Sequence, residues 1–526
     1  MTDILAGLHP SRLDYPQSDI RPERVSFGEL AYDDPYRWLE EDDDPAVIAW
    51  QSAQDDLTQN YLDALPTLGD FADRVRTIGE TDDVIAPTFA GGRWFRRHVP
   101  EGQDLTVVEV CAGPTEPGRR LIDLNAMRTD EPLSLSSLSP SPDGRKIIFT
   151  WTAGGREEPA LRVLDIDTGA ILVDGIPHKK PINFAWLPDS DGFIYAALDA
   201  SIAGEPPLHR LYLDNPSAVT PEDVKPGHPV IRPVLAADKR HIILMADHLA
   251  PCPAFILDTQ GEDGWQPFLK DVPGIFRGDI LGDNFVAITD DGAPRGRLVS
   301  IPLARPTQRD SWTELVPASD DVLAFVAVTG GRAVLLDWID TYSRLRTIGG
   351  DGRIEGEIAL PGRGMVNAFG PNAVLPTMID PIVRAADGEI VFVFSTFDRA
   401  AALCTANLAT REVTRLTEPK YRLDAQVLDL DCRSADGARV VYHVVARADL
   451  DLSTPQPSVI TGYGGFNLAM APGWLGTQWA AWIEAGGVVV LGHFRGGGEF
   501  GTPWFEQGRM KLKQNSFNDV HVVPCV

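Results

Sequence analysis

The sequence predicts an all-β seven-bladed propeller, with a helical segment before it and the first part of an α/β domain after it. Three observations predict this class. Helical periodicity is confined to residues 1–80, a turn-and-strand unit recurs through residues 81–422, and strands alternate with candidate helices in residues 423–526. A chain of 526 residues exceeds what one hydrophobic core organises, so these three ranges are expected to be separate domains.

The helical segment is predicted from capping residues and from apolar spacing. Asp34-Pro35 and Asp44-Pro45 each place a side-chain acceptor at a possible N-cap and a proline at the first helical position. Apolar side chains then recur at near-helical spacing, namely Val47, Trp50, Leu57, Tyr61 and Leu65. We expect an amphipathic helix in residues 1–80 that packs on the C-terminal domain.

The propeller is predicted from a tight turn that is followed each time by an apolar strand. The copies stand about 44 to 57 residues apart, at Gly91-Gly92, Asp143-Gly144, Asp191-Gly192, Asp238-Lys239, Gly282-Asp283, Gly330-Gly331 and Asp387-Gly388. This period is close to that of propeller blades, which bury their faces by stacking around an axis. The alternative is a β-sandwich with further β modules, but its strands recur at shorter spacing.

The last part of the chain changes to alternating strands and helices. Residues 438–446 and 487–494 are predicted strands, and residues 457–465 are a predicted strand that runs into a glycine-rich turn. Residues 475–485 form a candidate helix. The run 487–494 is almost continuously apolar, as in a strand buried on both faces. Asn515 or Ser516 is expected to cap a further helix. This order is typical of the opening of an α/β fold.

Charge and cysteine content exclude several classes of function. The chain has 47 Lys and Arg against 75 Asp and Glu, a net charge of -28, which disfavours nucleic acid and anionic membranes as partners. Its five cysteines include no C-x-x-C pair, so neither a disulfide framework nor a zinc site is predicted, and a reducing compartment fits. Without a signal-like start or a membrane-length apolar run, we expect a cytoplasmic protein with no metal or cofactor.

Three short motifs near the C-terminus carry the functional signal. They are G-Y-G-G-F-N at residues 462–467, R-G-G-G-E-F-G at 495–501 and K-Q-N-S-F-N-D at 513–519. Glycine runs after strands allow close backbone approach, and alone they indicate no more than tight turns. Neither glycine motif has the Lys-Ser/Thr ending or the spacing of a phosphate-binding loop.

Together with D-P-Y-R-W-L-E-E at residues 34–41, these motifs resemble the prolyl oligopeptidase family, in the same order along the chain. The resemblance implies a seven-bladed propeller beside an α/β-hydrolase domain, and a Ser-Asp-His triad that cleaves short proline-containing peptides after proline. It implies that Tyr463 donates its hydroxyl to the oxyanion and that Phe466 lines the proline pocket. Arg495 and Glu499 are expected to structure the loop by ion pairing. A monomer without a cofactor is expected.

The nucleophile of this family lies on a G-x-S-x-G turn, and the 526 residues contain no such motif. We therefore expect an incomplete α/β-hydrolase domain, truncated before its nucleophile by a frameshift, an early stop or fragmentation, and no activity from this chain alone. The strand at 457–461 would keep an unpaired edge, which predicts poor solubility. The alternatives are a non-catalytic β-propeller binding module or pseudoenzyme, or an enzyme with paired carboxylates in the propeller.

Overall fold

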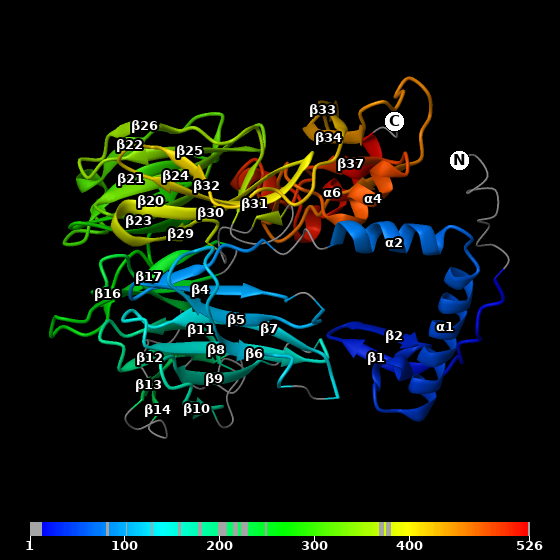
Figure 1. Ribbon diagram of the computed structural model, residues 1–526, viewed down its shortest axis with the longest axis horizontal. Helices are drawn as coiled ribbons and strands as arrows, with labels where there is room; N and C mark the ends of the chain where they lie inside the picture. The colour runs from blue at the N-terminus through cyan, green and yellow to red at the C-terminus, as the bar shows by residue number, and fades with distance from the viewer. Residues whose placement is uncertain are drawn as a thin grey trace. The chain divides into compact units, whose positions relative to one another are not determined.

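The computed structural model describes residues 13–79, 84–100, 102–127, 130–155, 159–176, 181–197, 208–213, 219–221, 230–247, 250–367, 373–374 and 380–523. The chain divides into two compact units, residues 1–77 and 78–526. Figure 1 shows the chain coloured from its N-terminus to its C-terminus.

The first unit contains a β-hairpin and helices. Strands β1 (Glu23–Phe27) and β2 (Leu30–Asp34) pair antiparallel, and helices α1 (Pro45–Asp63) and α2 (Leu68–Gly79) follow. The predicted start of α1 is confirmed, because the Asp44 side chain accepts a hydrogen bond from the Ala46 N–H and Pro45 occupies the first turn.

The helix predicted at Asp34-Pro35 is wrong. Asp34 is the last residue of β2, and its carboxylate accepts the Tyr36 N–H at 2.9 Å. This side-chain turn, which competes with helix formation, leaves only one 3-10 turn at Arg37–Glu40.

The second unit begins with antiparallel sheets that follow one another along the chain (Figure 1). The first sheets are β3–β6 (Thr88–Ala90, Arg93–His98, Val107–Cys111, Arg119–Asp123), β7–β10 (Leu133–Pro140, Lys146–Ala153, Ala160–Asp165, Ile171–Asp174) and β11–β14 (Pro181–Trp186, Gly192–Ala197, Leu208–Tyr212, Val219–Pro221). The next are β15–β18 (Val230–Leu235, His241–Ala246, Cys252–Asp258, Gln266–Pro267), β19–β22 (Phe276–Leu281, Asn284–Thr289, Arg297–Pro302, Thr313–Val316) and β23–β26 (Val322–Thr329, Arg332–Ile339, Tyr342–Ile348, Ile354–Ile358). The last joins β27 (Met365–Asn367), β29 (Val383–Arg384), β30 (Glu389–Thr396), β31 (Arg399–Asn407) and β32 (Val413–Arg415).

Each apolar strand predicted after a tight turn is present, and each lies in a different sheet. They are β4, β8, β12, β16, β20, β24 and β30, and each is second in the hydrogen-bonded order of its sheet. The turns before them use left-handed backbone, as at Gly92 (φ 76°) and Gly144 (φ 68°), where glycine carries no steric penalty.

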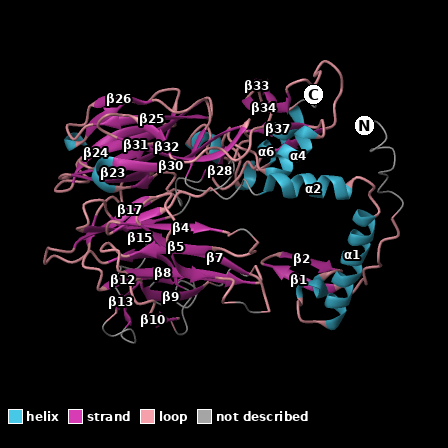
Figure 2. Ribbon diagram, viewed as in Figure 1, coloured by secondary structure: helices cyan, strands magenta, loops and turns pink. Residues whose placement is uncertain are grey.

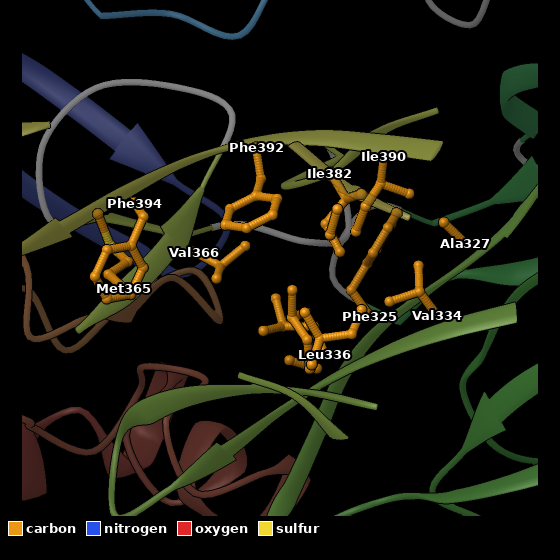
Figure 3. Packing of buried hydrophobic residues seen from close by; sticks show 14 of the residues in the cluster. Phe325, Ala327, Val334, Leu336, Met365, Val366, Ile382, Ile390, Phe392 and Phe394 are labelled. Carbon is orange, nitrogen blue, oxygen red and sulfur yellow. The ribbon is translucent and has the colours of Figure 1, made fainter. Parts of the chain in front are cut away.

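Neighbouring sheets are joined by buried apolar side chains. Figure 3 shows one such cluster, in which Phe325, Val334 and Leu336 pack with Ile390 and Phe392 of the following sheet. Equivalent clusters join each earlier sheet to the next, and Trp94 of β4 lies in one cluster with Val391 and Val393 of β30. Each fully buried Phe, Leu, Ile or Val contributes roughly 1.5–3 kcal/mol, so these contacts dominate the stability of the β region.

A smaller sheet follows the β region. Strands β33 (Ala425–Arg433), β34 (Arg439–Arg447), β37 (Val488–Gly492) and β35 (Ser458–Thr461) lie in that order, and β35 and β37 are parallel. The predicted strands at 438–446 and 487–494 are thus confirmed, as is the helix at 475–485, which is α4 (Thr477–Glu484). The strand predicted to run into a glycine-rich turn at 457–465 is β35, and the turn follows it from residue 462.

The remaining elements near the C-terminus are short. They are α5 (Thr502–Glu506), a 3-10 turn at Met510–Leu512 and α6 (Gln514–Val522). Helix α6 exists as predicted, but its N-cap is Lys513, so the capping role expected for Asn515 or Ser516 is wrong. The Ser516 hydroxyl instead bonds backbone carbonyls of other loops.

A separate two-stranded sheet links a segment of the β region to the segment between the two glycine motifs. Strand β28 (Ala373–Val374) pairs with β36 (Ala469–Met470), which lies between the two glycine motifs. Figure 2 shows that the described α-helices belong to the N-terminal part and to the part around the smaller sheet. None of the described helices has the length and apolar character that crossing a bilayer requires.

Candidate active site

Two glycine-rich loops meet at one edge of the smaller sheet. The loop 462–467 follows β35, and the loop 495–501 follows β37. Because these strands are parallel neighbours, their carboxyl ends lie together, where α/β folds place their ligands. The loops bond each other directly, since the Asn467 N–H donates to the Gly496 carbonyl at 3.1 Å.

The contact between the loops requires glycine. Gly496 has φ 102°, and a Cβ added there would lie 2.2 Å from the Gly464 carbonyl oxygen. Any side chain at this position would therefore force the loops apart. The glycine motifs thus serve close packing of two backbones.

Two aromatic side chains project from the first loop. Tyr463 is 53% exposed and Phe466 is 65% exposed, with their ring centroids 6.2 Å apart. Phe466 and Asn467 have φ values of 54° and 56°, a left-handed conformation that is unusual for residues other than glycine. The loop therefore holds a phenol hydroxyl and an apolar ring side by side at the surface, on strained backbone.

Arg495 is the centre of a buried hydrogen-bond network. Its side chain is 1% exposed and bonds the fully buried Asp519 through Nε at 3.0 Å and through a terminal nitrogen at 2.7 Å. It also pairs with the half-exposed Asp436 and donates to the Ser434 hydroxyl at 3.0 Å. The network fixes the start of the second loop against β33–β34 and helix α6.

Glu499 is buried away from Arg495. It is 1% exposed, and its Oε1 accepts the Met470 N–H at 2.9 Å. Burial raises the pKa of Glu499 to about 8, and burial lowers the pKa of His493, whose Nδ1 is 3.6 Å away, to about 3. At neutral pH both groups are therefore uncharged, and Glu499 is held by a backbone hydrogen bond.

The third motif donates hydrogen bonds to the backbone of both glycine loops. Lys513 Nζ donates to the Gly464 carbonyl, and the Ser516 hydroxyl donates to the Arg495 carbonyl. The structure thus brings together all three motifs singled out in the sequence. It leaves Tyr463 and Phe466 at the surface, and it places Arg495 and Glu499 in two separate buried environments.

Sequence reasoning missed the partners of these residues. Asp519 ends the K-Q-N-S-F-N-D motif, so that motif gave a signal for it, although nothing indicated its contact with Arg495. Asp436, Ser434 and His493 lie in stretches that gave no functional signal. Their roles depend on the pairing of β33, β34 and β37.

Repeated antiparallel sheets, followed by a smaller sheet with glycine loops at the carboxyl ends of its parallel strands, are the arrangement of a β-propeller joined to part of an α/β domain. The N-terminal β-propeller domain of prolyl oligopeptidases matches residues 17–378, and the prolyl oligopeptidase family matches residues 475–523. The chain belongs to the prolyl oligopeptidase family.

Two of its relatives are prolyl endopeptidases. The chain is 23% identical to the prolyl endopeptidase of Elizabethkingia meningoseptica, over 96% of its own length and 72% of the relative's. It is 24% identical to that of Elizabethkingia miricola, over 98% and 73% of the two chains.

Solved structures share the fold. A prolyl endopeptidase structure from a study of inter-domain dynamics in catalysis and specificity superposes with a TM-score of 0.84 at 27% identity, covering 97% of this chain and 75% of the other. Prolyl oligopeptidase B from Galerina marginata, bound to a 35-residue substrate, superposes with a TM-score of 0.80 at 19% identity over 96% and 75%. The second likeness is one of fold.

Proposed function

We propose that this protein is a prolyl oligopeptidase-type serine endopeptidase that acts on short peptides after proline. In this proposal Tyr463 donates its hydroxyl to the oxyanion and Phe466 forms a wall of the proline pocket. Residues 1–80 form the helical segment, residues 81–422 form one propeller of seven blades that limits substrate size, and residues 423–526 belong to the α/β-hydrolase domain. Membership of the family and the prolyl endopeptidase relatives support this assignment.

The observation that carries the proposal is the exposure of Tyr463 and Phe466 on a loop whose backbone is held by hydrogen bonds. Large aromatic side chains of a glycine-rich loop are normally buried, because burial removes their apolar surface from water. Left-handed backbone at Phe466 costs about 1–3 kcal/mol and is typical of functional loops. Presenting a hydroxyl donor and an apolar ring to one ligand accounts for both features.

The seven-bladed propeller is supported by the packing of the sheets. Each sheet shares a buried cluster with the next, and β30 of the last shares one with β4 of the first. A ring of this kind leaves an axial passage that is narrower than a folded protein, which accounts for a preference for short peptides.

We further propose that the 526-residue polypeptide alone does not hydrolyse peptides. Acyl transfer needs a nucleophile, a base and an orienting acid in contact, and these residues contain no G-x-S-x-G turn. An oxyanion donor without a nucleophile has no tetrahedral intermediate to stabilise. On its own this polypeptide is then a binding protein for proline-containing peptides.

The test combines turnover and binding on the purified 526-residue polypeptide. A fluorogenic prolyl peptide should give neither a burst nor turnover. An uncleaved proline peptide should bind more tightly than its alanine counterpart, and Phe466→Ala should weaken proline-peptide binding about tenfold, a loss of about 1.4 kcal/mol. Leu430→Ala, at a partly exposed residue of β33, serves as the matched control.

Two outcomes would contradict parts of the proposal. A burst of product would contradict the inactivity proposed for the 526-residue polypeptide, because it would show that these residues contain a working nucleophile. Peptide binding that ignores proline and is unchanged by Phe466→Ala would favour a non-catalytic propeller module instead.

A further inference from the structure

A cavity lies between the β region and the second glycine loop. About 30 Å³ of it is free for water-sized groups, and it opens to solvent. Its walls come from β19, β23, β24, the β20–β21 turn and the loops that follow Phe466 and Arg495; the polar side chains among them are those of Arg277, Asp290, Arg295, Trp338, Asn467 and Thr502. We call it the arginine cavity.

The arginine cavity carries a net positive charge in a protein whose net charge is -28. Its lining includes two arginines and one carboxylate, that of Asp290. Both Asp290 oxygens already accept hydrogen bonds, from the Ile275 N–H at 2.7 Å and from the Thr502 hydroxyl at 2.8 Å. The remaining charge therefore favours an anion.

Two buried donors on residues that line the cavity have no acceptor in the described part of the chain. Trp338 is 5% exposed, and its Nε1 has no hydrogen-bond partner in the part of the chain that the structure describes. The same holds for Nε of Arg277. Native proteins rarely leave buried donors unpaired, and such groups commonly mark the place of a bound acceptor.

The charge of Arg277 lowers the stability of the folded protein. Burial lowers its pKa to about 10, so it is still a cation at neutral pH, and Asp290 is the carboxylate that favours its charge. Arg295 is fixed differently, since it donates to the Asp320 carbonyl and lies 5.9 Å from the Phe500 ring. A partly buried cation without full pairing is costly, which indicates retention for binding.

The position of the cavity relates it to the candidate active site. Asn467, in its wall, follows Tyr463 by four residues. An extended chain spans at most about 3.6 Å per residue, so the two positions are at most roughly 14 Å apart, or about four extended residues of a bound peptide.

We propose that the arginine cavity binds a carboxylate, the free C-terminus of a peptide that lies across Tyr463 and Phe466. Arg277 supplies the charge, and Trp338 Nε1–H and Arg277 Nε–H supply hydrogen bonds. The inference rests on the proposed function and deepens it, because a carboxylate site in the cavity would select peptides that end within a few residues after proline. A narrow cavity with donors at its wall suits a chain end.

The test measures peptide binding to the 526-residue polypeptide by calorimetry. A short uncleaved proline peptide with a free C-terminus should bind at least tenfold more tightly than its C-terminal amide. Arg277→Met should abolish this ratio, and Trp338→Phe, which removes only the donor, should reduce it severalfold. Arg353→Met, at a largely exposed arginine, is the control and should leave the ratio unchanged.

Equal affinity of acid and amide would overturn the inference. Tight binding of an amidated peptide that ends in Glu would also overturn the inference, because the cavity would then recognise a side-chain carboxylate. Arg277→Met should keep or raise the urea midpoint of the polypeptide, because an apolar chain replaces a partly buried cation. Loss of the acid-to-amide affinity ratio in this variant would then not reflect unfolding. A lowered midpoint would assign Arg277 to stability and contradict the inference.

The two proposals fail in different ways. If acid and amide bind equally and both need Phe466, the proposed function stands and the carboxylate site fails. If no proline peptide binds but acetate raises the Tm of the wild type and not of Arg277→Met, the carboxylate site stands and the proposed function fails.

Discussion

At the scale of single residues, the second glycine loop buries two ionisable groups in two different ways. Arg495 meets Asp519, Asp436 and the Ser434 hydroxyl, and Ser434 also donates to Asp519 at 2.6 Å. Glu499 lacks such a cation, and its raised pKa keeps it neutral instead. The two residues of one glycine motif thus show the two ways of burying an ionisable group.

Removing Asp519 tests how much the Arg495 network contributes. Asp519→Ala leaves a buried guanidinium with one half-exposed partner, and we expect the free energy of unfolding to fall by about 3–5 kcal/mol. Urea unfolding followed by tryptophan fluorescence measures it. Asp351→Ala is the matched control, because Asp351 pairs with exposed Arg353 at 3.8 Å and should contribute less than about 1 kcal/mol. Equal effects of the two variants would mean that the buried pair adds no particular stability.

At the scale of elements, one turn of the β region is joined to the smaller sheet by polar contacts. The turn between β24 and β25 places Thr341 Oγ1 3.2 Å from His443 Nε2, and Tyr342 donates its hydroxyl to Asp429 at 2.7 Å. Asp429 also lies 2.8 Å from His443 Nδ1. The His443 ring further contacts the rings of Phe397 and His493. This junction buries a titratable imidazole between two elements.

The junction predicts a dependence of stability on pH. Burial lowers the pKa of His443 from 6.5 to about 4, against the opposing effect of Asp429. A depressed pKa means that the stability contributed above pH 6.5 is lost as pH falls toward 4, at up to about 1.4 kcal/mol per pH unit. Between pH 6.5 and 5 the wild type should lose about 2 kcal/mol more than His443→Asn, which keeps a donor toward Asp429.

The comparison with His443→Asn isolates this residue from its neighbours. His493, with a pKa of about 3, loses stability in the same direction, whereas Glu499, with a pKa of about 8, gains stability as pH falls. Both are present in wild type and variant. His521→Asn, at an exposed residue of α6, is the control. Parallel stability profiles of wild type and His443→Asn would refute the assignment.

Elements with a local chemical cause could be predicted from the sequence. The strands after the tight turns and the start of α1 are specified by neighbouring residues, namely left-handed glycines and the Asp44 cap. The pairing of β28 with β36 and the contact of Arg495 with Asp519 join segments that are distant in sequence. Nothing local indicates them. Likewise an aspartate such as Asp34 can cap a helix or close a turn, and the sequence near it favours neither. The pairing of β1 with β2 places Asp34 in a turn.

At the scale of the whole molecule, the three functional motifs could be found from the sequence, but their environments could not. The motifs indicated that Tyr463, Phe466, Arg495 and Glu499 belong to one site. Burial separates the exposed pair from the buried pair, and burial depends on how the β region and the smaller sheet meet. The arginine cavity could not be predicted for the same reason, because its walls come from the β region and from the glycine loops of the smaller sheet.

The order of the smaller sheet makes a final prediction about the 526-residue polypeptide. Strand β35 pairs with β37 on one side, and the described residues place no strand on its other side. Its outer N–H and C=O groups are therefore open to another chain, a common cause of edge-to-edge association. We expect concentration-dependent association in sedimentation velocity. Thr461→Lys, which puts a charge on this edge, should raise the monomer fraction severalfold, whereas Ser453→Lys, an equal charge at an exposed site before β35, should not. A polypeptide that sediments as one monomer at every concentration would show that this edge is covered by something other than a strand.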